Sequence, residues 1–184
     1  TPWERLTMAE AIKKHLGFDV SKLDDGELKE KAEELKVKIG KRGRKFNRGL
    51  TVASIFELVE DKLGGPVFIT DFPKETTSLC KLHRNDPNLI ERFEPYIGGK
   101  EVGNAYTELN DPDLQRRFFE EEVKAKKEGD EEAHPLDEDF LTAVEHGMPP
   151  TGGLGLGIDR MVMIMTGTHA IRDVIAFPTL RNKK

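Results

Sequence analysis

A run of alternating glycines followed by an arginine is the segment of the chain with the clearest chemical meaning. Glycine occupies every second position at Gly153, Gly155 and Gly157, and Arg160 follows three residues later. Because a strand points alternate side chains to opposite faces, a strand here has one face without side chains. Such a face lets a planar group, for example an adenine ring, lie close to the backbone beside the arginine. The alternative is a glycine-rich turn that leads into a core helix.

Acidic side chains upstream form a second candidate site. Gly98 and Gly99 predict a hairpin with a two-residue turn, which places Tyr96 opposite Glu101 and Glu94 opposite Gly103. Glu94, Tyr96 and Glu101 then share one face, with the carboxylates on a cross-strand diagonal about 7–8 Å apart at Cα. Hard oxygen ligands in this arrangement suit Mg²⁺ together with substrate phosphates. The alternative is a solvent-exposed acidic face that lysine and arginine side chains neutralise.

A third set of polar residues, Asn104, Tyr106 and Glu108, follows the hairpin with the period of a strand. An amide, a phenol and a carboxylate that face one way form a polar wall able to receive an ammonium group. On a regular strand, however, Glu101 and Glu108 would point to opposite faces. We therefore expect a β-bulge or a sharp twist at Gly103, so that both carboxylates can serve one site.

The elements that must position these residues are predicted by periodicity and by capping signals. Thr7 and Glu10 have the spacing of a capping box, and Asp111 precedes a proline that suits the first position of a helix. The run from Met161 to Met165 predicts a buried helix whose first turn aims Arg160 at the glycine strand. Further elements are expected as helices over residues 7–17, 25–40, 51–63, 111–129 and 137–147, a strand over 67–70, a polar loop over 71–89 and a hairpin over 92–109. Short strands among helices favour an α+β fold, an antiparallel sheet flanked by helices.

Composition narrows the class of protein. The chain has 184 residues, of which 34% are charged. Its net charge of −5 argues against broad, unspecific nucleic-acid binding but does not exclude a local basic patch. No apolar run approaches membrane-spanning length, and no secretory leader is evident at the N-terminus. The single cysteine, Cys80, excludes a disulfide framework within the chain and fits a reducing compartment. The basic segment from Lys41 to Arg48 is either a solvated connector or a contact for RNA phosphates.

These motifs together resemble a known family. Arg92-Phe93-Glu94 and the segment from Gly98 to Asp111 resemble the active-site hairpin of class II lysyl-tRNA synthetases, and the glycine strand through Arg160 resembles class II motif 3. Shorter resemblances continue at residues 129–133, 147–152 and 171–178, and more weakly at 2–17. The resemblance implies a partial class II synthetase catalytic fold of the α+β class.

The resemblance also implies a role for each candidate site residue. Glu94 and Glu101 would hold Mg²⁺ on the phosphates of ATP, and Arg160 would contact the triphosphate or the adenine side, so that Glu101 and Arg160 act in catalysis. Lysine would lie among Asn104, Tyr106, Glu108 and Gly155, with Glu108 meeting its ε-ammonium group. Gly153 and Gly157 would line the ATP site. The reaction implied is the ATP-dependent activation of lysine to lysyl-adenylate and its transfer to tRNA(Lys).

The resemblance covers only part of a class II synthetase. The expected organisation is a C-terminal portion of the catalytic domain, with a helical connecting region that carries the basic loop over residues 1–66 and the active-site sheet, hairpin and motif 3 over 67–184. Motif 1, motif 2 and the anticodon-binding domain are not recognised in the sequence. Since the arginine of motif 2 clamps the α-phosphate in this family, the chain alone is expected to be inactive. The parent enzyme is expected to be a cytoplasmic homodimer.

Two other functions remain open at this point. The first is a related ligase that attaches lysine to a protein, elongation factor P, and lacks the anticodon domain. The second is a non-catalytic binding module that has kept the synthetase fold. Magnesium-dependent ATP binding would count against the second. The sequence expected upstream of Thr1, with or without an anticodon domain, would decide the first.

Overall fold

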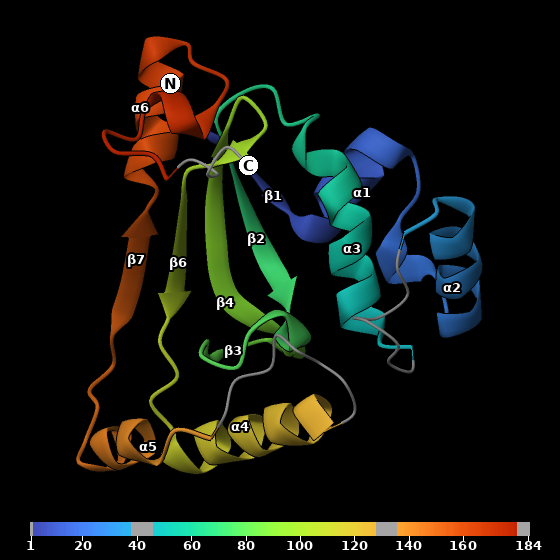
Figure 1. Ribbon diagram of the computed structural model, residues 1–184. Coiled ribbons are helices and arrows are strands. Elements are labelled where there is room, and N and C mark those ends of the chain that lie inside the picture. The colour runs from blue at the N-terminus through green and yellow to red at the C-terminus, as the bar shows by residue number, and fades with distance from the viewer. Residues whose placement is uncertain (1, 38–45, 128–135, 180–184) are drawn as a thin grey trace, which may run out of the picture.

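The computed structural model describes residues 2–37, 46–127 and 136–179. Its centre is a sheet of seven strands in these residues, with the order β1-β2-β4-β6-β7 and with β3 and β5 both paired to β4 (Figure 1). The strands are β1 (Glu4–Thr7), β2 (Val67–Pro73), β3 (Leu82–His83), β4 (Asp86–Ile97), β5 (Lys100–Glu101), β6 (Gly103–Thr107) and β7 (Gly152–Leu156). The glycine strand β7 therefore forms one edge of the sheet.

Helices gather at three places around this sheet. Helices α1, α2 and α3 lie beside β1 and β2, whereas α4 and α5 lie at one end of the strands and α6 at the other (Figure 1). Their bounds are α1 (Met8–Leu16), α2 (Asp25–Glu34), α3 (Arg48–Glu60), α4 (Pro112–Lys127), α5 (Glu138–Glu145) and α6 (Ile158–Thr166). Short 3₁₀ turns occur at Val20–Lys22, Lys74–Thr76 and Ile171–Asp173. The predicted α+β class is confirmed.

Helix starts follow the predicted capping signals. The Thr7 hydroxyl accepts from the Glu10 amide at 3.1 Å, and the Glu10 carboxylate accepts from the Thr7 amide at 2.8 Å. This capping box satisfies two amides that have no partner within the helix. The Asp111 carboxylate likewise accepts from the Leu114 amide at 3.0 Å at the start of α4. The predicted helix starts at 7 and 111 are therefore confirmed.

The hydrophobic core lies between helices α1 and α3 and one face of β2. Ile12 from α1, Ile55 and Val59 from α3, and Ile69 from β2 are all fully buried. Burial of such side chains contributes roughly 1.5–3 kcal/mol each. Ile69 lies opposite Glu94 in the sheet, so the two side chains point to the same face. Helix α3 therefore packs on the face to which Glu94 points.

Three predicted elements have wrong boundaries. The helix expected over residues 51–63 spans Arg48–Glu60 instead. The second helix ends at Glu34 rather than near Gly40, and Lys36 follows in a left-handed conformation with φ 57°. The polar loop expected over residues 71–89 contains the end of β2, all of β3 and the start of β4. Backbone pairing of β4 with β2 and β3 fixes this segment as strand, although its polar side chains carry no clear period-two pattern.

The sheet is mixed rather than purely antiparallel. Strand β1 is not predicted by the sequence, and it runs parallel to β2 with Leu6 opposite Ile69. Four residues with two charges offer little local signal, and the strand forms because β2 supplies a partner edge. Residues 1–66 therefore contribute a strand to the sheet as well as helices.

The basic segment over residues 41–48 is only partly described. Residues 41–45 lie outside the described ranges, so the predicted choice between connector and RNA contact is not decided for them. Arg48 is engaged within the fold, because its guanidinium pairs with Asp25 at 2.9 Å and donates to the carbonyls of Val20 and Leu23 at 3.0 and 2.7 Å.

Helix α6 forms as expected, but most of it is not buried. Only Met163 of the apolar run is buried, and Met165 is 83% exposed. The edge strand β7 also exposes Leu154 and Leu156, which lie on the face opposite to its glycines. No other described element covers this apolar surface, and that is why the expectation of a core helix is wrong. No helix in the described part of the chain combines the length and apolarity needed to cross a membrane.

Candidate active site

The acidic hairpin turns at Gly98 and Gly99, both with positive φ, and pairs Tyr96 with Glu101 as predicted. Further from the turn the register changes, because β4 and β6 pair Phe93 with Ala105. One extra residue has therefore entered the returning strand. The expected pairing of Glu94 with Gly103 is wrong by one residue for this reason.

The extra residue is Val102, which separates β5 from β6. Its amide donates to the Pro95 carbonyl at 2.8 Å, and its own carbonyl accepts from the Gly157 amide at 3.0 Å. A Cβ on the neighbouring Gly103 would lie 2.8 Å from the Gly155 carbonyl oxygen, so glycine is required at this close approach. The predicted irregularity is confirmed one residue before Gly103. As a result, Glu101 falls on the same face of the sheet as Asn104 and Tyr106.

Two glycines of β7, Gly153 and Gly155, differ in the space that is available for a side chain. Gly153 lies opposite Tyr106 and Gly155 opposite Asn104, so the face without side chains adjoins the polar wall. A Cβ on Gly153 would lie 1.8 Å from Oε1 of Glu108, which already occupies that space. A Cβ on Gly155 would meet no atom closer than 3.9 Å. Gly153 therefore makes room for the Glu108 carboxylate in its present position, whereas the surface over Gly155 is open.

Glu108 is a partly buried carboxylate without a cationic partner in the described residues. Its backbone is held on both sides, by a bridge to Cys80 and by a bond from its amide to the Thr151 carbonyl at 2.9 Å. Desolvation raises the pKa of Glu108 above the ordinary value. A carboxylate that is held beside a bare strand and lacks a counter-charge is suited to receive a ligand cation.

Asn104 and Tyr106 complete the polar wall. The Asn104 side-chain amide donates to the Tyr106 hydroxyl at 3.2 Å. The Oδ1 atom of Asn104 is buried and has no hydrogen-bond partner among the residues that the structure describes. An acceptor in this state is satisfied by a donor from a bound ligand.

Glu94 is 4% exposed and is held by two neighbours on its own strand. Arg92 pairs with one carboxylate oxygen, and the Tyr96 hydroxyl donates to the other at 2.9 Å. The same hydroxyl lies 3.1 Å from Oε1 of Glu60, at the end of α3. Desolvation raises the pKa of Glu94, Arg92 offsets part of this effect, and Glu101 raises it again.

Arg92 and Glu60 were not singled out by the sequence. Arg92 lies two residues before Glu94 on the same strand, a spacing that places both side chains on one face. Arg92 also belongs to the Arg92-Phe93-Glu94 segment of the family resemblance, which gave it no separate role. Glu60 reaches the hairpin through tertiary packing of α3, and the sequence gives no indication of it.

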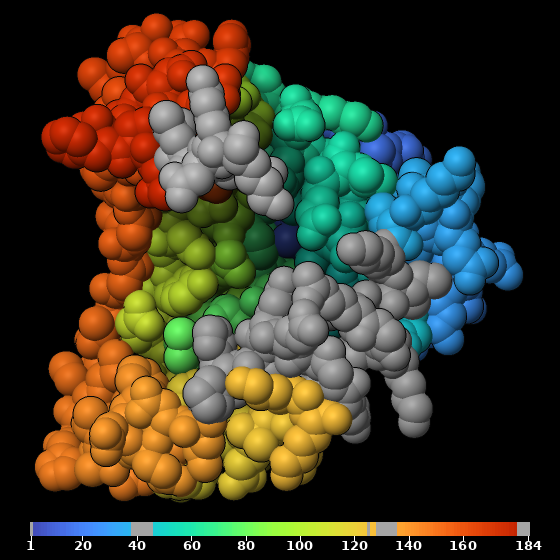
Figure 2. Space-filling model, viewed as in Figure 1, coloured from blue at the N-terminus to red at the C-terminus, as the bar shows by residue number. Residues whose placement is uncertain are grey.

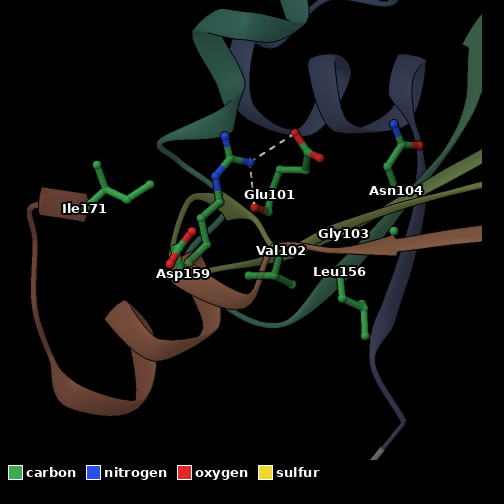
Figure 3. A pocket seen from close by; sticks show the side chains of 10 residues that line it. Glu101, Val102, Gly103, Asn104, Leu156, Asp159 and Ile171 are labelled. Atoms are coloured by element: carbon green, nitrogen blue, oxygen red, sulfur yellow. Dashed lines mark hydrogen bonds and ion pairs between the residues drawn. The ribbon is translucent and has the colours of Figure 1, made fainter. Parts of the chain in front are cut away.

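Arg160 reaches the hairpin from the first turn of α6. Its Nη1 donates to the Glu101 carbonyl at 2.8 Å and to Glu101 Oε2 at 3.2 Å, the two contacts drawn as dashed lines in Figure 3. These residues border a hollow that also includes Asn104, Gly155 and Ile171. Figure 2 shows the molecular surface hollowed over β4 and β6, between β7 and α3. If a phosphate and a cation entered the hollow, Arg160 would pair with the phosphate and Glu101 with the cation. The contact between Arg160 and Glu101 would then be replaced.

The carboxylates fit a shared Mg²⁺ ion rather than a site made by protein alone. No group of three or more potential metal ligands of the kind His, Cys, Asp or Glu occurs within the described ranges. Glu94 and Glu101 face one side of the hairpin, and the charge of Glu101 contributes to the raised pKa of Glu94. Two carboxylates that repel each other are stabilised by a cation between them, and Mg²⁺ commonly completes its shell with phosphate oxygens.

Comparison with known proteins shows the family of the chain. Residues 1–181 match the family model for class II tRNA synthetases (D, K and N). A lysine–tRNA ligase from Saccharolobus solfataricus is 51% identical over 99% of this chain and 37% of its own length. The lysine–tRNA ligases of Sulfolobus acidocaldarius and a Thermoanaerobacter species are 47% and 48% identical, over 98% and 99% of this chain and 36% of their own lengths.

The chain thus spans little more than a third of the length of these relatives. Within that span the match extends across the hairpin, the glycine strand and the arginine described above. On the family model, which covers almost the whole chain, the protein belongs to the class II tRNA synthetases of the D, K and N group.

Proposed function

We propose that this chain supplies the lysine-binding and metal-binding part of the active site of a lysine–tRNA ligase. The observation that carries the proposal is Glu108, a partly buried carboxylate without a cation partner among the described residues, set against the bare face of β7. Relatives named lysine–tRNA ligase support the choice of lysine. The ε-ammonium of lysine would satisfy this carboxylate by a charge-assisted hydrogen bond.

The amino-acid side of the site is proposed as Asn104, Tyr106, Glu108 and Gly155. Glu108 selects a cationic side chain, and Asn104 Oδ1 accepts from a second donor of the substrate. Gly155 leaves the strand surface open for the ligand, since no atom lies within 3.9 Å of its missing Cβ.

The nucleotide side is proposed as Glu94, Glu101, Gly153, Gly157 and Arg160. Arg160 exchanges Glu101 for a phosphate, which a planar guanidinium binds through two parallel hydrogen bonds. Mg²⁺ bound by Glu94 and Glu101 would supply neutralisation of the phosphate charge. Gly153 makes room for Glu108 in addition.

The reaction proposed is attack of the lysine carboxylate on the α-phosphorus of ATP, which displaces pyrophosphate and forms lysyl-adenylate. A hydroxyl group of tRNA(Lys) then attacks the lysyl carbonyl carbon, and AMP leaves. The reaction needs positioning and charge neutralisation rather than a protein nucleophile. The only cysteine, Cys80, fits this view because burial raises its pKa to about 12 and keeps it a thiol. Glu101 and Arg160 are the proposed catalytic residues.

The organisation of the parent enzyme is part of the same proposal. We expect residues 1–66 to connect to the active-site portion over 67–184, and the rest of a cytoplasmic homodimer to provide the α-phosphate clamp and the anticodon-binding domain. ATP–pyrophosphate exchange by the 184-residue chain alone is therefore expected to be negligible. The relatives' names favour tRNA as the acceptor over a protein.

A crossed pair of variants tests the proposed division of the site. Glu108→Gln should weaken lysine binding by roughly 10- to 100-fold, the value of one charge-assisted hydrogen bond, and leave MgATP binding within about threefold. Glu101→Gln should show the reverse pattern. Calorimetric titration of each variant with lysine and with MgATP measures the two affinities. Equal losses of the two ligands in either variant would contradict the assignment.

A further inference from the structure

Arg92 occupies an unusual position in the middle of the sheet. It lies on β4 opposite Tyr106 on β6, and its side chain is only 14% exposed. The centre of its guanidinium lies 4.5 Å from the ring centroid of Phe72, on β2, and 5.5 Å from that of Tyr106. Its Nη2 pairs with Glu94. One side chain is thus held by groups from three neighbouring strands.

The position is not explained by charge neutralisation alone. A buried guanidinium between Glu94 and Tyr106 lies beside two places proposed to receive cations, Mg²⁺ and the ε-ammonium of lysine. By Coulomb's law its positive charge opposes both ligands. Burial of a long cationic side chain also costs conformational and desolvation free energy. Its contribution must therefore come from geometry, because a planar group that packs against two rings and pairs with a carboxylate fixes their relative orientation.

A second arginine–glutamate pair, between Arg84 in the turn before β4 and Glu91 on β4, provides the contrast. Arg84 Nε contacts Glu91 at 2.8 Å, but the Arg84 side chain is 76% exposed and is not stacked on any aromatic ring in the described part of the chain. Arg84 can leave its partner for solvent, whereas Arg92 cannot move without disturbing Phe72, Tyr106 and Glu94 together.

We propose that Arg92 is a positioning residue that fixes the Glu94 carboxylate and the Tyr106 ring relative to each other, and so couples the metal side of the site to the lysine side. This inference rests on the proposed function for the identity of the two ligands. It assigns Arg92 no contact with either ligand.

The packing is tested first without any ligand. The chain has two tyrosines, Tyr96 and Tyr106, so labelling with 3-fluorotyrosine gives two ¹⁹F signals that Tyr96→Phe assigns. Arg92→Lys keeps the charge but removes the planar guanidinium that packs against Phe72 and Tyr106, and it should displace the Tyr106 signal. Arg84→Lys is the matched control and should leave that signal in place. An unmoved Tyr106 signal in Arg92→Lys would overturn the inference.

The coupling is tested with ligands. Mn²⁺ affinity in the presence of ATP, measured by electron paramagnetic resonance, should fall about tenfold in Arg92→Lys, as is typical when an outer partner of a metal ligand is lost. Lysine affinity should fall by a similar factor, and Arg84→Lys should change neither. Because the charge is kept, the loss cannot come from altered repulsion of the metal. A loss confined to one of the two ligands would overturn the coupling.

A second variant reads the same coupling from the opposite end. Tyr106→Leu removes the ring on which Arg92 stacks, and it should lower Mn²⁺ affinity although Tyr106 is not a proposed metal ligand. The Mn²⁺ affinity of the double variant, Arg92→Lys with Tyr106→Leu, should be no lower than that of either single variant. A double-mutant cycle measures this. Additive losses would refute the inference. If the unaltered chain binds neither Mn²⁺ with ATP nor lysine, the proposed function itself fails, a result distinct from normal binding that Arg92→Lys leaves unchanged.

Discussion

Replacement of single glycines on β7 gives the sharpest test of the site. Gly153 and Gly155 lie on the same strand and the same face, two residues apart. Adding one methyl group at each position perturbs the site in two different ways. Gly153→Ala places a Cβ against Glu108, and Gly155→Ala places one over open surface.

The structure sets the size of each effect. In Gly153→Ala, Oε1 of Glu108 must move from 1.8 Å to beyond 3.0 Å from the new Cβ, because real Cβ contacts essentially never fall below that distance. The displaced carboxylate can no longer meet the substrate ammonium, and the loss of one charge-assisted hydrogen bond costs about 1.5–3 kcal/mol, or roughly 10- to 100-fold in lysine affinity. In Gly155→Ala the nearest atom is 3.9 Å away, so the fold accepts the methyl group without movement.

Stability separates the two variants as well. Alanine is favoured over glycine within a strand by about 0.5–1 kcal/mol. We therefore expect Gly155→Ala to raise the free energy of unfolding by about that amount. In Gly153→Ala the same gain is offset by the displacement of Glu108.

The assays are urea unfolding, followed by circular dichroism, and titration with lysine and with MgATP. Lysine affinity that is unchanged in Gly153→Ala would refute the role of Glu108. A free energy of unfolding lowered by more than about 1 kcal/mol in Gly155→Ala would refute the open surface over Gly155, since such a loss is typical of a steric clash.

Two further predictions concern acid stability and self-association. Arg84 holds the pKa of Glu91 at about 2, below the ordinary value of 4.5, by hydrogen bonding to its carboxylate. Since this folded-state pKa is lowered, the pair stabilises the fold above about pH 4.5 and this stability is lost as the pH falls toward 2. Glu91→Gln should therefore flatten the fall of the unfolding free energy over this range, and an unchanged slope would contradict the assignment. The exposed Leu154 and Leu156 predict self-association, which sedimentation velocity should detect and which the double change to threonine should reduce; a wild-type monomer at high concentration would contradict this.

Local patterns account for most of the elements that the sequence predicts correctly. The capping box of Thr7 and Glu10, the cap at Asp111 and the turn at Gly98–Gly99 each involve residues at most three positions apart. Their free energies depend on backbone conformations that a short segment adopts by itself. The pairing of Tyr96 with Glu101 follows directly from such a turn.

Features that depend on partners distant in the chain were not predictable. Strand β1, the strands within residues 71–89 and the exposure of α6 are decided by which edges and faces meet after folding. The approach of Glu60 to Tyr96 likewise requires α3 to pack on the sheet.

The sequence by itself determined the hairpin, the glycine strand and the carboxylates and arginine able to bind a cation and a phosphate. Strand periodicity and turn conformation depend only on residues close together in the chain. Only the tertiary structure decided that Val102 is the extra residue, that Glu108 fills the space over Gly153, and that Arg92 connects Glu94 with Tyr106. These relations depend on the relative placement of β4, β6 and β7. Such placement is set by long-range packing, which no short stretch of sequence contains.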